Sequence, residues 1–137
     1  MALYTQPDTS KGSFYANPEV DVPQEISERS RQLHPEYCRP NIWPSEHIPT
    51  LQHAFMAAGA AALEAGYLLA AAIDRLLLSY KGTPPDCPSL EAQLRGSQCH
   101  KGRLLHYFAP SQTAGTDDSW CGWHFDHSAL TGTGTVF

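Results

Sequence analysis

The sequence is short of basic residues and of paired cysteines. Its 137 residues hold nine Lys and Arg against fourteen Asp and Glu, a formal net charge of −5. The basic residues do not cluster, so the chain lacks the electrostatic footprint of a nucleic-acid-binding protein and we expect no nucleic-acid partner. The four cysteines form no C-x-x-C pair.

The first residues also lack a basic stretch followed by an apolar one, so no signal peptide is predicted. We therefore expect reduced cysteines and a cytoplasmic protein. A zinc site from Cys87, Cys99 and His100 is a weak alternative, because its spacing matches no known zinc finger. Four histidines lie in proline-rich, helical or loop contexts and are expected at the surface: His34, His47, His53 and His100.

A long segment rich in Ala and Leu is the clearest feature that the sequence does have. Residues 49–80 contain no internal proline and are followed by Gly82 and two prolines, which predicts one long helix. Apolar residues at steps of three and four predict its buried face: Leu51, Phe55, Ala58, Ala62, Leu69, Ile73, Leu76 and Tyr80. Residues 25–33 and 88–96 predict two short helices, the second with Ser89 as its N-cap.

Residues 54–73 carry a single charge, Glu64, so a membrane span has to be weighed. Most of these residues are Ala or Gly, and a carboxylate in mid-span costs about 2.5–3.5 kcal/mol. We therefore favour a buried helix of a soluble protein and expect no membrane partner. A small membrane-associated protein anchored by this segment remains an alternative.

The pattern changes from helix to strand after residue 100. Residues 101–108 (KGRLLHYF) and 120–126 predict two strands, separated by a polar loop over 110–119, and residues 129–137 predict the beginning of a third. Residues 1–24 are expected to be extended or loop, and 34–44 an ordered proline-rich loop. Helices followed by strands indicate an α+β fold whose sheet is only begun.

His124 and Asp126 are the candidate metal ligands. In a strand, side chains at positions i and i+2 point to the same face, so the imidazole and the carboxylate would converge. They would supply two of the three donors of a 2-His-1-carboxylate iron(II) site, with Trp120 and Trp123 excluding water. H-x-D also occurs by chance, and a His–Asp hydrogen bond on an exposed strand is the plainer interpretation.

On the preceding strand, His106 and Tyr107 are adjacent, so only one of them can face the same pocket. We favour Tyr107, although an aromatic side chain on a sheet face is the more frequent role for such a residue.

Four ordered segments resemble the non-haem iron(II), 2-oxoglutarate-dependent dioxygenases, and among them the isopenicillin N synthase-like branch. The segments are 11–18 (KGSFYANP), 37–44 (YCRPNIWP), 101–108 (KGRLLHYF) and 118–131 (DSWCGWHFDHSALT). The resemblance implies a double-stranded β-helix, a variant of the jelly roll. Residues 1–100 would form a helical and loop support, and residues 101–137 would begin the oxygenase core, leaving the barrel incomplete.

The resemblance also implies Fe(II), with 2-oxoglutarate as cosubstrate and O₂ as oxidant of a small organic substrate. His124 and Asp126 match the first two iron ligands, and Tyr107 matches a cosubstrate-contacting tyrosine. The synthase relatives dispense with 2-oxoglutarate, so cosubstrate use stays open.

The family's distal His and its Arg-x-Ser cosubstrate clamp have no counterpart after Asp126. We therefore expect a fragment that is catalytically incomplete. The alternative is a non-catalytic remnant that acts through protein contacts, and in either case open sheet edges favour self-association.

Overall fold

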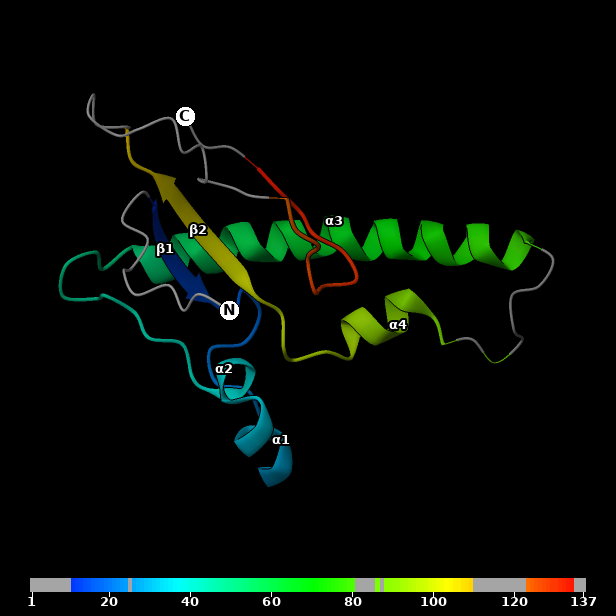
Figure 1. The fold of residues 1–137 in the computed structure, drawn as a ribbon, viewed down its shortest axis with the longest axis horizontal. Coiled ribbons are helices and arrows are strands. Elements are labelled where there is room, and N and C mark those ends of the chain that lie inside the picture. The colour runs from blue at the N-terminus through cyan, green and yellow to red at the C-terminus, as the bar shows by residue number, and fades with distance from the viewer. Residues whose placement is uncertain (1–10, 25, 81–85, 87, 110–122, 135–137) are drawn as a thin grey trace.

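One long helix, crossed by a two-stranded ribbon, organises the protein (Figure 1). The computed structural model describes residues 11–24, 26–80, 86, 88–109 and 123–134. In chain order the elements are β1 (Lys11–Ala16), α1 (Glu28–Leu33), α2 (Pro35–Cys38), α3 (Leu51–Ser79), α4 (Leu90–Arg95) and β2 (Gly102–Tyr107).

The predicted long helix is confirmed as α3, which runs without interruption for 29 residues. Its length follows from its Ala and Leu content, since these residues lose little freedom in a helix. The chain leaves the helix at Tyr80, whose backbone is extended and whose N–H still bonds to the carbonyl of Leu77.

The two predicted short helices are confirmed as α1 and α4. The hydroxyl of Ser27 accepts a hydrogen bond from the N–H of Ser30, and Ser89 does the same for Ala92, so each helix has a serine N-cap. The prediction of a loop over 34–44 is wrong at α2. Pro35 occupies the first turn of that helix, where its missing N–H has no intrahelical partner to lose.

The sheet is an antiparallel pair, with Lys11 opposite Tyr107 and Ala16 opposite Gly102. The strand predicted over 101–108 is confirmed as β2, and the extended segment near the N-terminus is its partner β1. The sheet thus joins the two regions divided at residue 100. The mixture of helix with a small sheet is consistent with an α+β fold, and the jelly roll stays a prediction.

The strand predicted over 120–126 is wrong for residues 123–126, and so is the third strand for residues 129–134. The remaining positions of both predicted strands lie outside the described residues. Trp123 and Phe125, which would share one face of a strand, are almost fully exposed. His124 and Asp126, which would share the other face, are 61% and 49% exposed, so neither face is packed against the rest of the described chain. Apolar pattern alone does not make a strand without a partner that satisfies its backbone groups.

Three aromatic rings form the centre of the packing: Phe14 of β1, Trp43 of the loop before α3, and Phe55 of α3. Their centroids lie 5.6–5.9 Å apart in tilted and edge-on arrangements, the geometry that aromatic pairs prefer. Trp43 is held by its indole N–H, which donates to Asp21 at 2.6 Å. This cluster fastens the ribbon across the first half of α3.

The prediction of a buried α3 is wrong. Only Phe55, Tyr67 and Ala70 are buried, on the side that meets the ribbon and α4. Five residues of the expected buried face are exposed: Ala58, Ala62, Leu69, Leu76 and Tyr80. The packing side was missed because it contains Gly59, whose missing side chain lets Pro18 approach closely.

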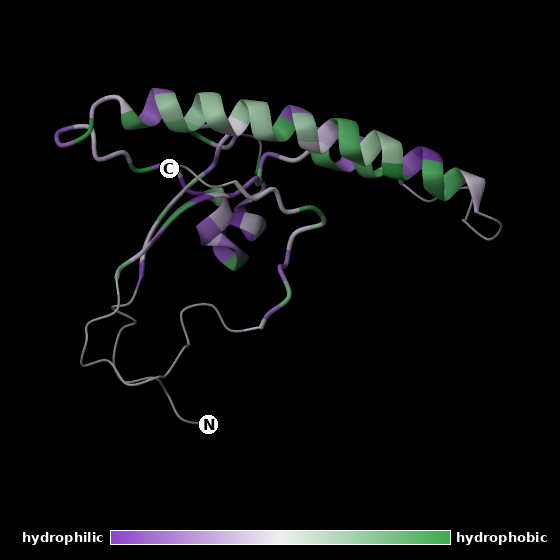
Figure 2. Ribbon diagram, turned by 90° about the horizontal axis from the view of Figure 1, so that it is seen from above, coloured by the Kyte–Doolittle hydropathy of each residue, from purple (hydrophilic) through white to green (hydrophobic). Residues whose placement is uncertain are grey.

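The opposite side of α3 is apolar and uncovered. Figure 2 shows apolar residues along the whole helix, yet only 11% of its most apolar 18-residue window is buried. By length and composition α3 could cross a membrane, which is weak evidence by itself.

Candidate functional site

His124 and Asp126 do meet in the structure. Nε2 of His124 lies 3.3 Å from Oδ1 of Asp126, and the two side chains are 61% and 49% exposed. The contact forms in a non-strand segment, so it does not arise from the strand alternation that the sequence predicted. Next to it, the hydroxyls of Ser128 and Thr131 share a hydrogen bond of 2.7 Å, which closes the following turn.

The spacing of the two donor atoms fits adjacent ligands of one metal ion. A bond of about 2.1 Å, as imidazole and carboxylate make to zinc, places two donors at right angles roughly 3.0 Å apart. The same spacing also fits the plainer His–Asp contact. Across the described parts of the chain, no three His, Cys, Asp or Glu side chains gather closely enough to hold a metal ion.

The tryptophans were expected to shield this pair from water. Trp123 is fully exposed, so that expectation is wrong for it, and Trp120 lies outside the described residues. The pair is therefore open to solvent. Water molecules compete with the protein for every coordination position of a bound metal.

Tyr107 is the last residue of β2 and stands opposite Lys11 in the ribbon. Its side chain is 37% exposed, so it is accessible to a ligand. Its role as a cosubstrate contact stays a prediction.

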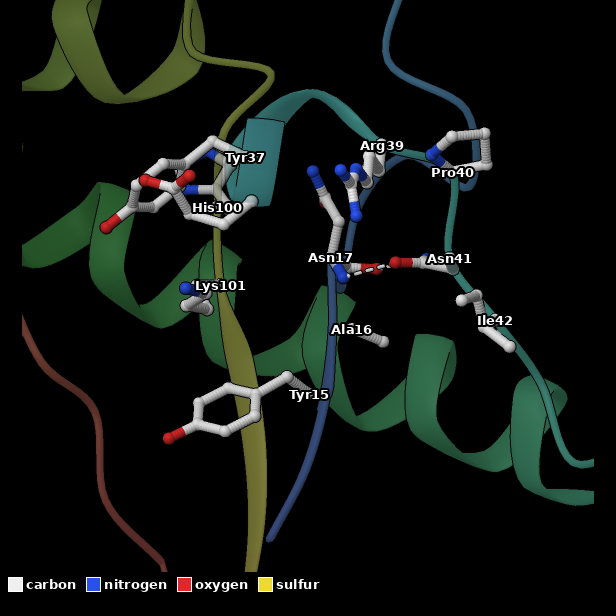
Figure 3. Close-up of a pocket in the computed structure, with 11 residues that line it drawn as sticks. Tyr15, Ala16, Asn17, Tyr37, Arg39, Pro40, Asn41, Ile42, His100 and Lys101 are labelled. Atoms are coloured by element: carbon white, nitrogen blue, oxygen red, sulfur yellow. Dashed lines mark hydrogen bonds between the residues drawn. The ribbon is translucent and has the colours of Figure 1, made fainter. Parts of the chain in front are cut away.

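Three of the four segments that carry the family resemblance come together around a small pocket of about 160 Å³ (Figure 3). Its lining comes from the end of β1, the segment after α1 and the residues before β2: Tyr15, Ala16, Asn17, Glu36, Tyr37, Arg39, Pro40, Asn41, Ile42, His100 and Lys101. Residues more than 80 positions apart in the sequence thus share one surface.

Asn17 and Asn41 join the first two of these segments. The N–H of Asn17 donates to Oδ1 of Asn41 at 2.6 Å, and Nδ2 of Asn41 donates to the carbonyl of Asn17 at 2.9 Å. Nδ2 of Asn17 also donates to the carbonyl of Gln98 at 2.7 Å, a residue just before the third segment. These bonds satisfy the asparagines within the fold, so they serve as a structural joint.

Lys101 adds a second tie in the same place. Its ammonium lies 4.5 Å from the ring centre of Tyr37 and 5.3 Å from that of Tyr15. Such cation–π contacts contribute about 0.5–1 kcal/mol each at exposed sites. Arg103 also lies near Tyr15, with its guanidinium 5.1 Å from the ring centre, and donates to the hydroxyl of Ser13.

His100 is not the surface residue that the sequence predicted. Its side chain is only 13% exposed, and its Nε2 lies 3.0 Å from the carbonyl of Leu94 and 3.4 Å from Oε2 of Glu19. Both neighbours are acceptors, so an N–H at Nε2 would have a partner in either of them. His34, His47 and His53 are exposed, as expected.

Glu19 also binds Tyr67, the most buried polar side chain of α3. The Tyr67 hydroxyl donates to Oε1 of Glu19 at 3.2 Å, and the Arg95 guanidinium stacks 4.3 Å from the ring centre. Burial first, and then the charge and hydrogen bond of Glu19, raise the pKa of Tyr67. No local sequence signal could reveal this cluster, because Glu19, Tyr67 and Arg95 come from three separate segments.

Asp74 holds the beginning of α4 against α3. Its two carboxylate oxygens accept from the N–H groups of Leu90 at 2.8 Å and Glu91 at 3.0 Å, and from the Ser89 hydroxyl at 2.7 Å. These bonds, that of Glu91 first, lower the pKa of Asp74. The carboxylate acts as a helix cap supplied by another helix.

The described residues do not support the zinc site that was weighed as an alternative. Cys87 lies outside the described residues, and Cys99 and His100 belong to no three-ligand group among the residues that are described. Cys38 and Cys99 are free thiols, Cys38 buried at the end of α2.

Comparison with known protein families, with characterised proteins and with solved structures finds no match to this chain.

Proposed function

We propose that this chain is part of a non-haem iron(II), 2-oxoglutarate-dependent oxygenase of the isopenicillin N synthase-like branch. In this proposal His124 and Asp126 hold two neighbouring positions on the iron, and Tyr107 contacts the cosubstrate. When bound, Fe(II) with 2-oxoglutarate would supply the oxidising chemistry toward a small organic substrate.

The 3.3 Å contact between His124 and Asp126 carries the proposal. The contacts of residues 11–18 with 37–44 through Asn17 and Asn41, and with 101–108 through the ribbon, also support it. Segments that are similar to one family in sequence order, and that also pack together in space, are harder to obtain by chance than a lone H-x-D pattern.

The chain offers the iron two donors, His124 and Asp126, and this number limits how tightly it binds the ion. It binds Fe(II) weakly, because three protein donors on one face are needed to hold the ion and orient its open positions. With these two donors alone we expect metal affinity without efficient turnover, since turnover depends on positioning.

Metal titration tests the half-site. Under anaerobic conditions, Fe(II) or the spectroscopic probe Co(II) is titrated into the wild type, His124→Ala, Asp126→Asn and His127→Ala. We expect one weak site, whose affinity falls at least about tenfold, roughly 1.4 kcal/mol, in the first two variants only. His127 is the matched control, because it adjoins the pair and is not a proposed ligand. Equal affinity in the wild type and His124→Ala would refute the site.

Turnover is measured separately, as CO₂ released from labelled 2-oxoglutarate in the presence of Fe(II) and ascorbate. We expect no release above the His124→Ala control. Release that depends on His124 would instead show that the described pair finds its remaining ligand elsewhere in the chain.

A further inference from the structure

The uncovered side of α3 is a continuous apolar surface. Its exposed residues, here called the outer face of α3, are Ala54, Ala57, Ala58, Ala61, Ala65, Leu68, Ala72 and Leu76. They recur at steps of three and four and lie opposite the packed residues Phe55 and Tyr67. Leu68 and Leu76 are 70% and 56% exposed.

The exposure of α3 itself indicates that its outer face is covered by a partner. Only 11% of the most apolar 18-residue window of this helix is buried. Large apolar patches on soluble proteins mark sites of association, and the outer face runs along most of this 29-residue helix.

Two opposite charges on this side of α3 indicate which partner binds the outer face. Glu64 and Arg75 are both exposed and lie eleven residues apart, which is three helical turns plus about 20° and roughly 16 Å along one side. A bilayer would have to bury or displace both charges. A second α3 running antiparallel would pair each Glu64 with Arg75 of the other copy, twice, around a two-fold axis.

The side chains between these charges allow close approach in that arrangement. The two-fold axis falls between residues 69 and 70, so Leu68 of one helix lies against the Ala71–Ala72 segment of the other. Alanines opposite a leucine let two helix axes approach toward the short end of the usual 8–10 Å range. Glu64 keeps the capacity to form the new pair, because its contact with Arg95 is 4.0 Å long and its side chain is 68% exposed.

We propose that the outer face of α3 binds a second copy of this chain, antiparallel and with two-fold symmetry. The contact extends over about 33 Å of helix from Ala54 to Leu76. A single helix pair of this length buries on the order of 1,000 Å², which is below the standard interface, so we expect a weak, transient association. This proposal does not depend on the metal site.

Analytical ultracentrifugation of the full chain over about 1–200 µM tests the association. We expect concentration-dependent dimers in the wild type, a loss of at least about tenfold in Leu68→Glu, and no change in Ile42→Glu. Ile42 is the matched control, because it is 82% exposed and lies outside the helices. A monomeric wild type, or dimers that persist in Leu68→Glu through the sheet edges, would overturn the proposal.

Charge exchange tests the direction of the helices. Glu64→Arg and Arg75→Glu each place like charges together in the antiparallel dimer, so each should weaken it about tenfold. The double variant restores both pairs and should return to within about threefold of the wild type, with circular dichroism confirming that all variants are folded. Failure of the double variant to recover overturns the antiparallel arrangement. Flotation of the wild type with neutral phosphatidylcholine vesicles, abolished in Leu68→Glu, would assign the face to a bilayer instead.

Discussion

Gly59→Ala measures how closely α3 packs on the segment after β1. A Cβ at this position would lie 2.3 Å from Cβ of Pro18, 3.0 Å from its carbonyl oxygen and 3.1 Å from its Cα. These are atoms of a rigid ring and of the backbone, and Pro18 is buried. The substitution therefore forces the two segments apart.

The expected change in stability is the sum of two opposing terms. Overpacking costs about 1–3 kcal/mol, and a contact of 2.3 Å belongs at the upper end. Replacing a glycine inside a helix by alanine returns about 0.8–1.0 kcal/mol. We expect Gly59→Ala to lower the free energy of unfolding by up to about 2 kcal/mol.

Gly66→Ala is the matched control in the same helix. No atom lies within 4 Å of a Cβ built there, so only the helix-propensity term applies and stability should rise by about 0.5–1 kcal/mol. Urea unfolding followed by circular dichroism at 222 nm separates the two variants by the sign of the change. If Gly59→Ala were as stable as Gly66→Ala, the close packing on Pro18 would be incorrect.

Two further predictions concern the polar ties of α3. Asp74→Asn should lower stability at pH 6. The pKa of Asp74 is lowered in the fold, so its contribution is present above the ordinary value of about 3.9. The contribution is lost as pH falls through the lowered value, and the urea midpoints of the two proteins should converge as the pH is lowered below about 3.9. A gap that stays constant with pH would contradict the helix-capping role. Tyr67→Phe should cost about 1 kcal/mol through the lost bond to Glu19. The pKa of Tyr67 is raised, so the tyrosine's contribution to stability is present below about pH 10 and is lost as the pH rises above it. Tyr67→Phe should therefore lose less stability than the wild type as the pH is raised past about 10. An equal loss in both proteins would contradict the buried hydrogen bond.

Local signals in the sequence predict the helices α1, α3 and α4, whereas α2 was missed. Ser27 and Ser89 are caps that act within one turn, and the alanines and leucines of α3 need no neighbour to favour a helix. The strand β2 is also predictable from its aliphatic and aromatic content. The effect of a residue on its own helical turn can therefore be predicted before any tertiary contact is known.

Features that depend on a distant partner were not predictable in the same way. The contact of Pro18 with Gly59 determines the packed side of α3, and the contact with Glu19 accompanies the burial of His100. Neither pairing can be recognised from the local sequence pattern. At the candidate site, the sequence correctly brought His124 and Asp126 together but for the wrong backbone reason. It overestimated strand there because it could not see whether a neighbouring strand existed.

The pairing of β1 with β2 has a consequence for the order of folding. Lys11 faces Tyr107 and Ala16 faces Gly102, so the ribbon closes loops of 107 − 11 = 96 and 102 − 16 = 86 residues. Closing such a loop costs on the order of 4 kcal/mol of chain entropy, whereas α3 forms from contacts four residues apart. During synthesis β1 stays unpaired until β2, 86 or more residues later, has been made. We therefore expect the ribbon to close after α3 has formed, so that variants that weaken α3 slow the formation of the sheet.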